Sequence, residues 1–130
     1  MRISGIAVFL VLSLVLAEGP APAQTVDLSG TWIGDTWVPN SEEKDNLTLV
    51  LKKDGTSYSG TITDSMGMLV AAVLEKVKLE KDTLTFEFVA RPGAQDLRIR
   101  AVMKLTGEKL AGSWESEMGD GAPLELVRKK

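Results

Sequence analysis

The chain has 130 residues, of which 44% are hydrophobic, 25% charged and 5% aromatic, and its formal net charge is −3. It contains no cysteine and no histidine, which excludes disulfides, thiol nucleophiles, zinc fingers and histidine-based acid–base catalysis. The acidic balance argues against a nucleic-acid-binding surface, because neutralising phosphates requires an excess of Lys and Arg.

The first 23 residues are typical of a cleaved secretory signal peptide. A positive charge near the start precedes an apolar stretch at 6–17, which is shorter than the roughly 20 residues that span a bilayer. Ala-Pro-Ala at 21–23 then supplies the small residues that a signal peptidase needs. We predict cleavage after Ala23, with Ala17 as the alternative cleavage site and an uncleaved N-terminal anchor as the alternative interpretation.

Residues 24–130 have apolar side chains that recur with period two, and short turn sequences divide the segments. In residues 83–88, for example, Leu and Phe alternate with Thr and Glu. The connections contain Gly, Asp or Pro and are short, which indicates antiparallel hairpins. The pattern predicts eight strands, at 30–38, 46–53, 56–63, 69–80, 83–90, 97–106, 109–116 and 123–129.

Eight hairpin-linked strands that each have one apolar face are expected to close into a barrel, because closure buries that face and removes both exposed sheet edges. We therefore predict an all-β fold, an eight-stranded antiparallel up-and-down barrel that forms a single domain over 24–130. Segment 69–80 is ambiguous. Its valines and leucines also follow a helical spacing, so a helix is the alternative there.

Several short motifs follow one another along the chain: Gly-x-Trp at 30–32, Lys-Asp-Gly at 53–55, Gly-Thr-Ile at 60–62, Leu-Thr-Phe at 84–86, Leu-x-Gly-x-Trp at 110–114 and Arg at 128. In their order and spacing these motifs resemble small exported bacterial lipocalin-like proteins of the calycin superfamily. The resemblance covers almost all of residues 24–130.

The resemblance implies a calycin or lipocalin-like barrel with a structural pair at its closed end. In such barrels the Trp of the opening motif, here Trp32, packs across the closed end, and a basic residue of the last strand, here Arg128, lies over its ring. The alternative is that Trp32 is an ordinary core aromatic and that Arg128 is a solvated charge near the C-terminus. Either way we expect Trp32 to stabilise the fold and not to contact a ligand.

The expected function depends on whether the barrel is hollow. Inward positions carry large residues but also Gly60, Ala101 and Gly112, which either mark bends in the sheet or leave room for a guest. We expect a soluble binding protein that holds a small apolar or amphipathic ligand in the barrel mouth. The predicted ligand-binding residues are Trp37, Tyr58, Phe86, Met103 and Trp114. The alternative is a filled barrel that acts as a protein-interaction or inhibitor-like module through its loops.

No catalytic residue, metal ligand or cofactor is predicted, because the serines have no histidine to activate them and the acidic residues near 117–120 lack the alternating pattern of a calcium loop. Loop 37–45 is expected to cover the barrel mouth, and the apolar loop 64–69 is a candidate contact surface. The expected partners are therefore a small apolar ligand or an unidentified protein, with no nucleic acid and no stable membrane insertion. The expected location is extracytoplasmic, periplasmic or secreted.

Overall fold

The computed structural model describes residues 27–130, so the predicted signal peptide and its cleavage sites lie outside the described residues. The described residues form strands and no helix, so this range contains no helix that could span a membrane. The strands are β1 (Gly30–Trp37), β2 (Lys44–Asp54), β3 (Ser57–Asp64), β4 (Ala72–Val73), β5 (Glu75–Glu80), β6 (Thr83–Ala90), β7 (Leu97–Thr106), β8 (Lys109–Ser116) and β9 (Gly121–Arg128).

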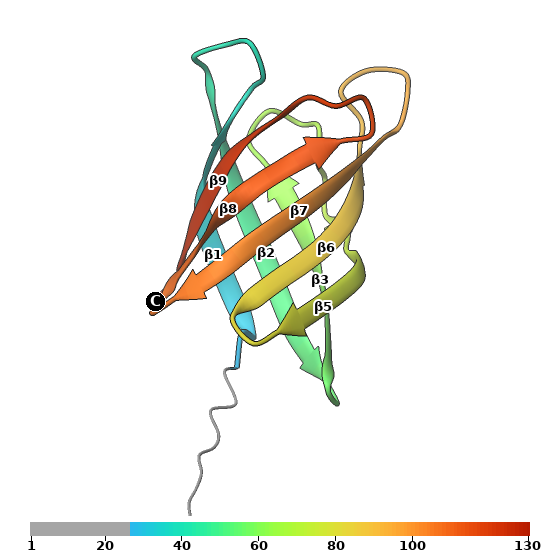
Figure 1. Cartoon of the computed structure of the whole chain (residues 1–130). Helices are drawn as coiled ribbons and strands as arrows, with labels where there is room; N and C mark the ends of the chain where they lie inside the picture. Colours follow the sequence, from blue (N-terminus) through green and yellow to red (C-terminus); the bar gives the residue numbers. More distant parts are fainter. Residues whose placement is uncertain (1–26) are drawn as a thin grey trace, which may run out of the picture.

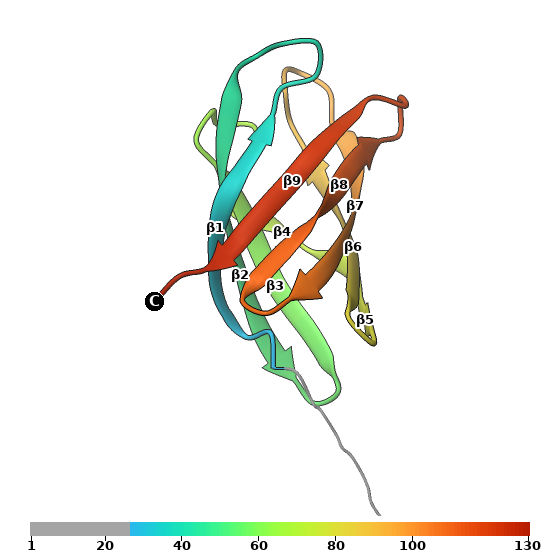
Figure 2. The same ribbon diagram turned by 60° about the vertical axis from the view of Figure 1, so that its left-hand side comes forward.

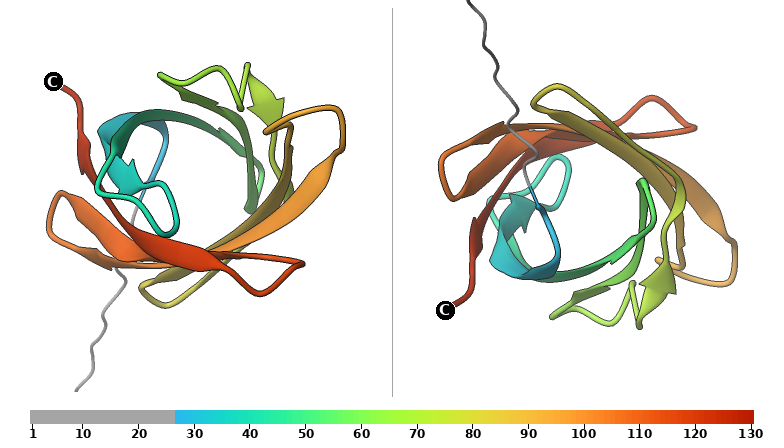
Figure 3. Two further views of the ribbon diagram at one scale, coloured as in Figure 1. Left: turned by 90° about the horizontal axis from the view of Figure 1, so that it is seen from above. Right: turned by 90° about the horizontal axis from the view of Figure 1, so that it is seen from below.

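All of these strands belong to one antiparallel sheet in the order β4-β3-β2-β1-β9-β8-β7-β6-β5. The first long strand and the last one, β1 and β9, pair in the middle of this order, as Figure 2 shows. The two edge strands, β4 and β5, follow each other in the chain, and β5 contacts β3 while β4 contacts β6. The sheet therefore curves into a nearly closed barrel (Figure 1 and Figure 3), which confirms the predicted all-β antiparallel barrel.

The predicted count of eight strands is wrong, because segment 69–80 does not form one continuous strand. It is divided into β4, which pairs with β3, and β5, which pairs with β6. Ala71 and Lys76 adopt positive φ angles of 48° and 52°, a region that L-residues rarely occupy and that interrupts an extended chain. The helix considered for this segment is wrong as well, since the segment contains no helical residue.

Leu74 lies between β4 and β5 and explains the interruption. Its side chain is buried in the core, whereas Val73 is exposed, so the alternation expected for one strand reverses at this point. The backbone N–H of Leu74 donates a hydrogen bond of 3.0 Å to the carbonyl oxygen of Gly60 on β3. The short segment thus reaches both neighbours in turn, which brings the two sheet edges together without a full-length strand between them.

The inward face of the barrel carries the predicted alternation. The fully buried large side chains on the strands are Trp32, Leu49, Leu51, Ile62, Leu84, Phe86, Met103, Leu110, Leu124 and Leu126, and Leu28, just before β1, is fully buried as well. A Cβ at Gly60 or Gly112 would lie 1.9 Å from a backbone carbonyl oxygen of the neighbouring strand, so these glycines permit close approach of two strands. The large buried side chains fill the middle of the barrel.

The two ends of the barrel differ in their connections (Figure 1). At one end, here called the closed end, the hairpins β2–β3, β5–β6 and β7–β8 are joined by the two-residue turns 55–56, 81–82 and 107–108. At the other end, here called the loop end, longer connections run through 38–43, 65–71, 91–96 and 117–120. Longer loops at one end leave that end available for a binding site.

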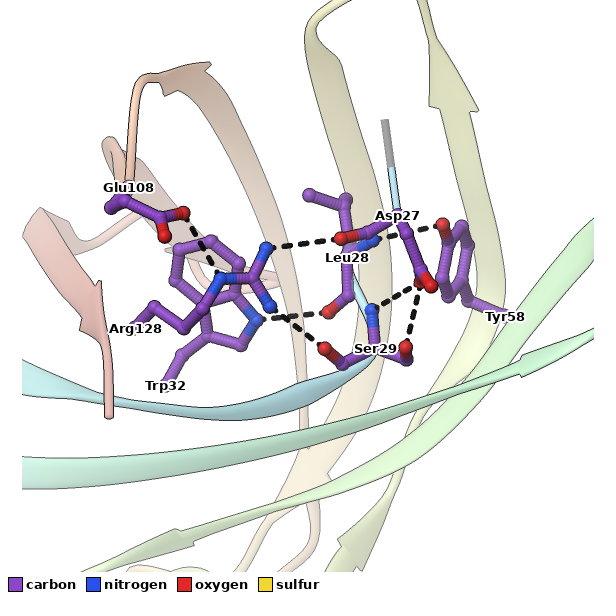
Figure 4. A network of polar contacts seen from close by, with 7 residues as sticks. All are labelled: Asp27, Leu28, Ser29, Trp32, Tyr58, Glu108 and Arg128. Carbon is purple, nitrogen blue, oxygen red and sulfur yellow. Dashed lines mark hydrogen bonds and ion pairs between the residues drawn. The ribbon is translucent and has the colours of Figure 1, made fainter. Parts of the chain in front are cut away.

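Trp32 and Arg128 lie together near the closed end (Figure 4). The Trp32 side chain is completely buried, and its Nε1–H donates a 3.0 Å hydrogen bond to the carbonyl oxygen of Leu28. The guanidinium carbon of Arg128 is 4.4 Å from the centre of the Trp32 ring, a favourable cation–π geometry. Arg128 also donates to the carbonyl oxygens of Ser29 and Asp27, at 2.8 Å and 3.0 Å, and to Glu108 at 3.0 Å. The guanidinium thereby fastens the segment that precedes β1 onto the last strand.

Candidate ligand-binding site

A cavity of about 300 Å³ opens at the loop end of the barrel. Its wall consists mainly of apolar side chains near the ends of the strands, with loop residues at the rim. The strands contribute Leu47, Ile62, Phe88, Ala90, Ile99 and Leu124, and the loops contribute Val38, Pro39, Met68 and Pro92. Small-molecule sites have volumes of about 300 to 1,000 Å³, so this cavity suits a small ligand.

Two of the five predicted ligand-binding residues, Trp37 and Trp114, line this cavity. The other three lie outside its lining. Phe86 and Met103 are fully buried in the filled middle of the barrel. Tyr58 belongs to the start of β3 near the closed end, where its hydroxyl oxygen accepts a hydrogen bond of 3.0 Å from the backbone N–H of Leu28. Figure 4 shows Tyr58 beside the segment that precedes β1.

A chain of hydrogen bonds holds one indole at the cavity wall. Trp114 Nε1–H donates to Thr36 Oγ1 at 2.7 Å, and the Thr36 hydroxyl donates in turn to the carbonyl oxygen of Pro123 at 2.7 Å. These contacts link β8, β1 and β9 at the loop end. Because both bonds are satisfied within the protein, the indole N–H is not available to a ligand and its ring acts as an apolar wall.

Among the described residues, the charged side chains that line the cavity are three aspartates. No Lys or Arg of this part of the chain lines it. Asp45 lies on β2, on the same inward face as Leu47, and is only 4% exposed. Asp64 ends β3, and Asp120 lies on the exposed β8–β9 loop, where its carboxylate accepts a hydrogen bond from Ser116 Oγ. The cavity is thus walled mainly by apolar side chains, and the charged side chains that line it are negative.

Asp45 and Asp64 are held by the loop that follows β3. The backbone N–H and the hydroxyl of Ser65 both donate to Asp45 Oδ1, at 3.2 Å and 3.1 Å, and the backbone N–H of Leu69 donates to Asp64 Oδ1 at 2.9 Å. The second oxygen of Asp64, Oδ2, is buried and has no hydrogen-bond donor among the described residues. A buried acceptor without a donor costs free energy, so a donor that reaches this atom would be favourable.

The surroundings of Asp45 favour its protonated form. Burial raises the pKa of Asp45 from the usual 3.8 to about 6, and a hydrogen bond with the Asp64 carboxyl and the negative charge of that group act in the same direction. The two hydrogen bonds from Ser65 act in the opposite direction and are weaker influences. A proton on Asp45 is the donor that the two carboxyl groups lack when both are ionised.

The carboxylates were not predicted, although the sequence carried a signal for them. The expected strand began at residue 46, and Asp45 was assigned to the loop covering the barrel mouth. Extending the alternation of Leu47 and Leu49 back by two residues places Asp45 inward, and extending Ile62 forward by two places Asp64 inward. In the structure this loop is shorter, at 38–43, and its residues Val38 and Pro39 line the cavity.

Comparison of the sequence with protein-family models and with curated proteins finds no match. Within residues 27–130, no group of three or more acidic side chains lies close enough together to hold a metal ion.

Proposed function

We propose that this protein is an exported binding protein, similar to lipocalins and other calycins, that holds a small apolar or amphipathic ligand in the mouth of its barrel. The observation that carries the proposal is the cavity of about 300 Å³ at the loop end, walled mainly by apolar side chains. Ligand sites are commonly concave, largely apolar and equipped with a few polar groups, and they occur in the mouths of β-barrels. The closed-end contact of Trp32 with Arg128 supports the calycin part of the proposal.

A matched pair of substitutions tests whether the cavity binds a ligand. Ala90 lines the cavity, whereas Ala101 is completely buried on the adjacent strand and lies outside the lining. We expect Ala90→Leu to weaken binding of 1-octanol by about tenfold or more, which corresponds to at least about 1.4 kcal/mol, because the added side chain occupies the ligand space. Ala101→Leu is expected to destabilise the protein by roughly 1 to 3 kcal/mol through overpacking and to leave octanol binding intact.

Octanol binding is measured by calorimetry and by the fluorescence of Trp37 and Trp114, and stability by urea unfolding. If the wild-type protein binds neither octanol nor a charged octyl probe, or if Ala90→Leu is as destabilising as Ala101→Leu, the space at the loop end is not a ligand site.

Export is tested on the protein made by its own organism. We expect the mature chain to begin near Gln24, because Ala-Pro-Ala at 21–23 provides a cleavage site after an apolar segment. N-terminal sequencing and intact mass of the extracytoplasmic protein check this. Recovery of the chain starting at Met1 from the cytosol would contradict it.

A second candidate function is a protein-interaction module that uses the loops. It is favoured by apolar side chains that remain exposed in or beside the loops, notably Val70 at 80%, Met118 at 79% and Val73 at 67%. Native mass spectrometry of protein purified from its source separates the two candidates. A bound small molecule supports the ligand-binding function, and a stoichiometric bound protein supports the interaction module.

A further inference from the structure

The cavity is lined by charged side chains of one sign. Asp45, Asp64 and Asp120 line it, and the nearest basic side chain on the same strands, Lys44, lies on the outward side of β2. There Lys44 is 4.0 Å from Asp35 and 5.7 Å from the centre of the Trp37 ring. The negative charge inside the cavity is therefore not balanced by a lining residue, and a bound anion would be repelled.

The acidic pair also lacks a donor. Asp64 Oδ2 is buried and accepts no hydrogen bond from residues 27–130 when both carboxyls are ionised, whereas Asp64 Oδ1 accepts one from the backbone N–H of Leu69. For Asp45 the donors come from Ser65, again to a single oxygen, Oδ1. A ligand that brings N–H groups to Asp45 and Asp64 would donate hydrogen bonds to both carboxylates. Charge-assisted hydrogen bonds of this kind are about twice as strong as neutral ones.

We propose that the ligand is an amphipathic cation, an amine with a compact apolar body, whose ammonium group is bound between the carboxylates of Asp45 and Asp64 while its apolar part fills the cavity. This inference rests on the proposed ligand-binding function and specifies its ligand class. A primary or secondary ammonium carries N–H donors and a positive charge, which are the two things the cavity lacks. A neutral ligand offers no charge, and the three acids do not gather into a metal site.

The test compares three probes with the same eight-carbon tail: n-octylammonium, 1-octanol and octanoate. At pH 7.5 we expect octylammonium to bind at least about tenfold more tightly than octanol, and octanoate to bind most weakly, because only the ammonium completes the carboxylate pair. Calorimetry gives the dissociation constants directly.

The variants are matched for charge. Asp45→Asn and Asp64→Asn are each expected to weaken octylammonium binding by about tenfold while octanol binding changes by less than about twofold. Asp54→Asn removes the same charge from the same strand, β2, but at the closed end, and should leave both affinities unchanged. Unchanged octanol binding shows that the cavity and the fold of each variant are intact.

A second measurement needs no substitution. Octylammonium stays charged between pH 7.5 and 5.0, since alkylammonium groups titrate near pH 10. The ionisable side chains around the site are Asp45 and Asp64, with Asp120 on the β8–β9 loop and Asp35 and Lys44 on the outward side. Protonation of Asp45 at pH 5.0 is expected to weaken octylammonium binding severalfold and to leave octanol binding unchanged.

The outcomes are distinguishable. Equal binding of octanol and octylammonium, tighter binding of octanoate, or unaffected octylammonium binding in both Asn variants overturns the amine inference but leaves the proposed function standing. Failure of all three probes to bind overturns the proposed function as well.

Discussion

Replacing Trp32 with Ala is expected to lower the free energy of unfolding by about 3 to 5 kcal/mol, the range for truncating a buried aromatic. The side chain is completely buried, its Nε1–H is bonded to Leu28, and the Arg128 guanidinium lies over its ring. Truncation would remove the ring, leave the carbonyl oxygen of Leu28 without its donor and open a void near the closed end. For a domain of this size the loss is a large share of the total stability.

Urea unfolding of Trp32→Ala and Trp32→Phe measures the effect. Trp32→Phe keeps most of the apolar volume but removes the indole N–H, so we expect an intermediate loss. Since Trp32 lies outside the cavity lining, octanol binding by any folded fraction should be unchanged. A destabilisation of Trp32→Ala below about 1 kcal/mol would contradict the role assigned to this residue.

A substitution of Arg128 tests the same contact from the other side chain. Its guanidinium bonds the carbonyl oxygens of Ser29 and Asp27 and contacts the Trp32 ring, so Arg128→Ala should also destabilise the fold. If the ring and the guanidinium stabilise each other, the double variant Trp32→Ala/Arg128→Ala will lose less than the sum of the two single changes. Strict additivity would mean that the two side chains contribute independently.

Period-two alternation predicted which side of each strand faces inward, and this part of the fold follows from local chemistry. Phe86 and Phe88, for example, are both buried as expected, with ring centres 5.9 Å apart. The nine-strand count did not follow, because the interruption at Leu74 depends on how two distant sheet edges meet. The alternation fits one continuous strand through Val73, Glu75, Val77 and Leu79. No residue type in the segment indicates that the strand is interrupted.

The cavity lining follows from the sequence less completely than the fold does, for a related reason. Alternation identifies the inward face of a strand but not the depth of a side chain along the barrel axis. The sequence analysis predicts Phe86 as a ligand contact. The residues of this strand that line the cavity are instead Phe88 and Ala90, two and four residues further along the same face. In the same way Ile99 lines it and Met103 does not. Trp37 and Trp114 line the cavity, since both lie near the loop ends of their strands.

The last prediction concerns pH and follows from the raised pKa of Asp45. In the folded protein this carboxyl has a pKa of about 6, against 3.8 when it is free of its surroundings. Between these values the folded state holds a proton that the unfolded state has released, so stability falls as pH rises. The contribution is fully present below pH 3.8 and is lost as pH rises through about 6. The difference of about two units limits its size to about 3 kcal/mol.

Asp45→Asn removes this titration and also removes the buried charge at neutral pH. We therefore expect the variant to be more stable than the wild type at pH 7.5, by up to about 3 kcal/mol, and nearly equal to it at pH 4. Asp54→Asn is the control for loss of one negative charge. The pKa of Asp27 is shifted in the other direction, lowered by the hydrogen bonds from Ser29, so its titration lies below 3.8 and outside this window.

Urea unfolding of the wild type and both variants at pH 4, 5, 6 and 7.5 provides the comparison. Parallel pH profiles for the wild type and Asp45→Asn would contradict a titrating, unfavourable charge at this position.

The same Asp45 charge attracts the ammonium group at the proposed amine site. At pH 7.5 the ionised Asp45 destabilises the wild type. A bound ammonium group supplies the missing positive charge and should offset this destabilisation, but only at pH values where Asp45 is ionised. Octylammonium is therefore expected to raise the unfolding free energy of the wild type more at pH 7.5 than at pH 5, and to stabilise Asp45→Asn less at pH 7.5 than it stabilises the wild type.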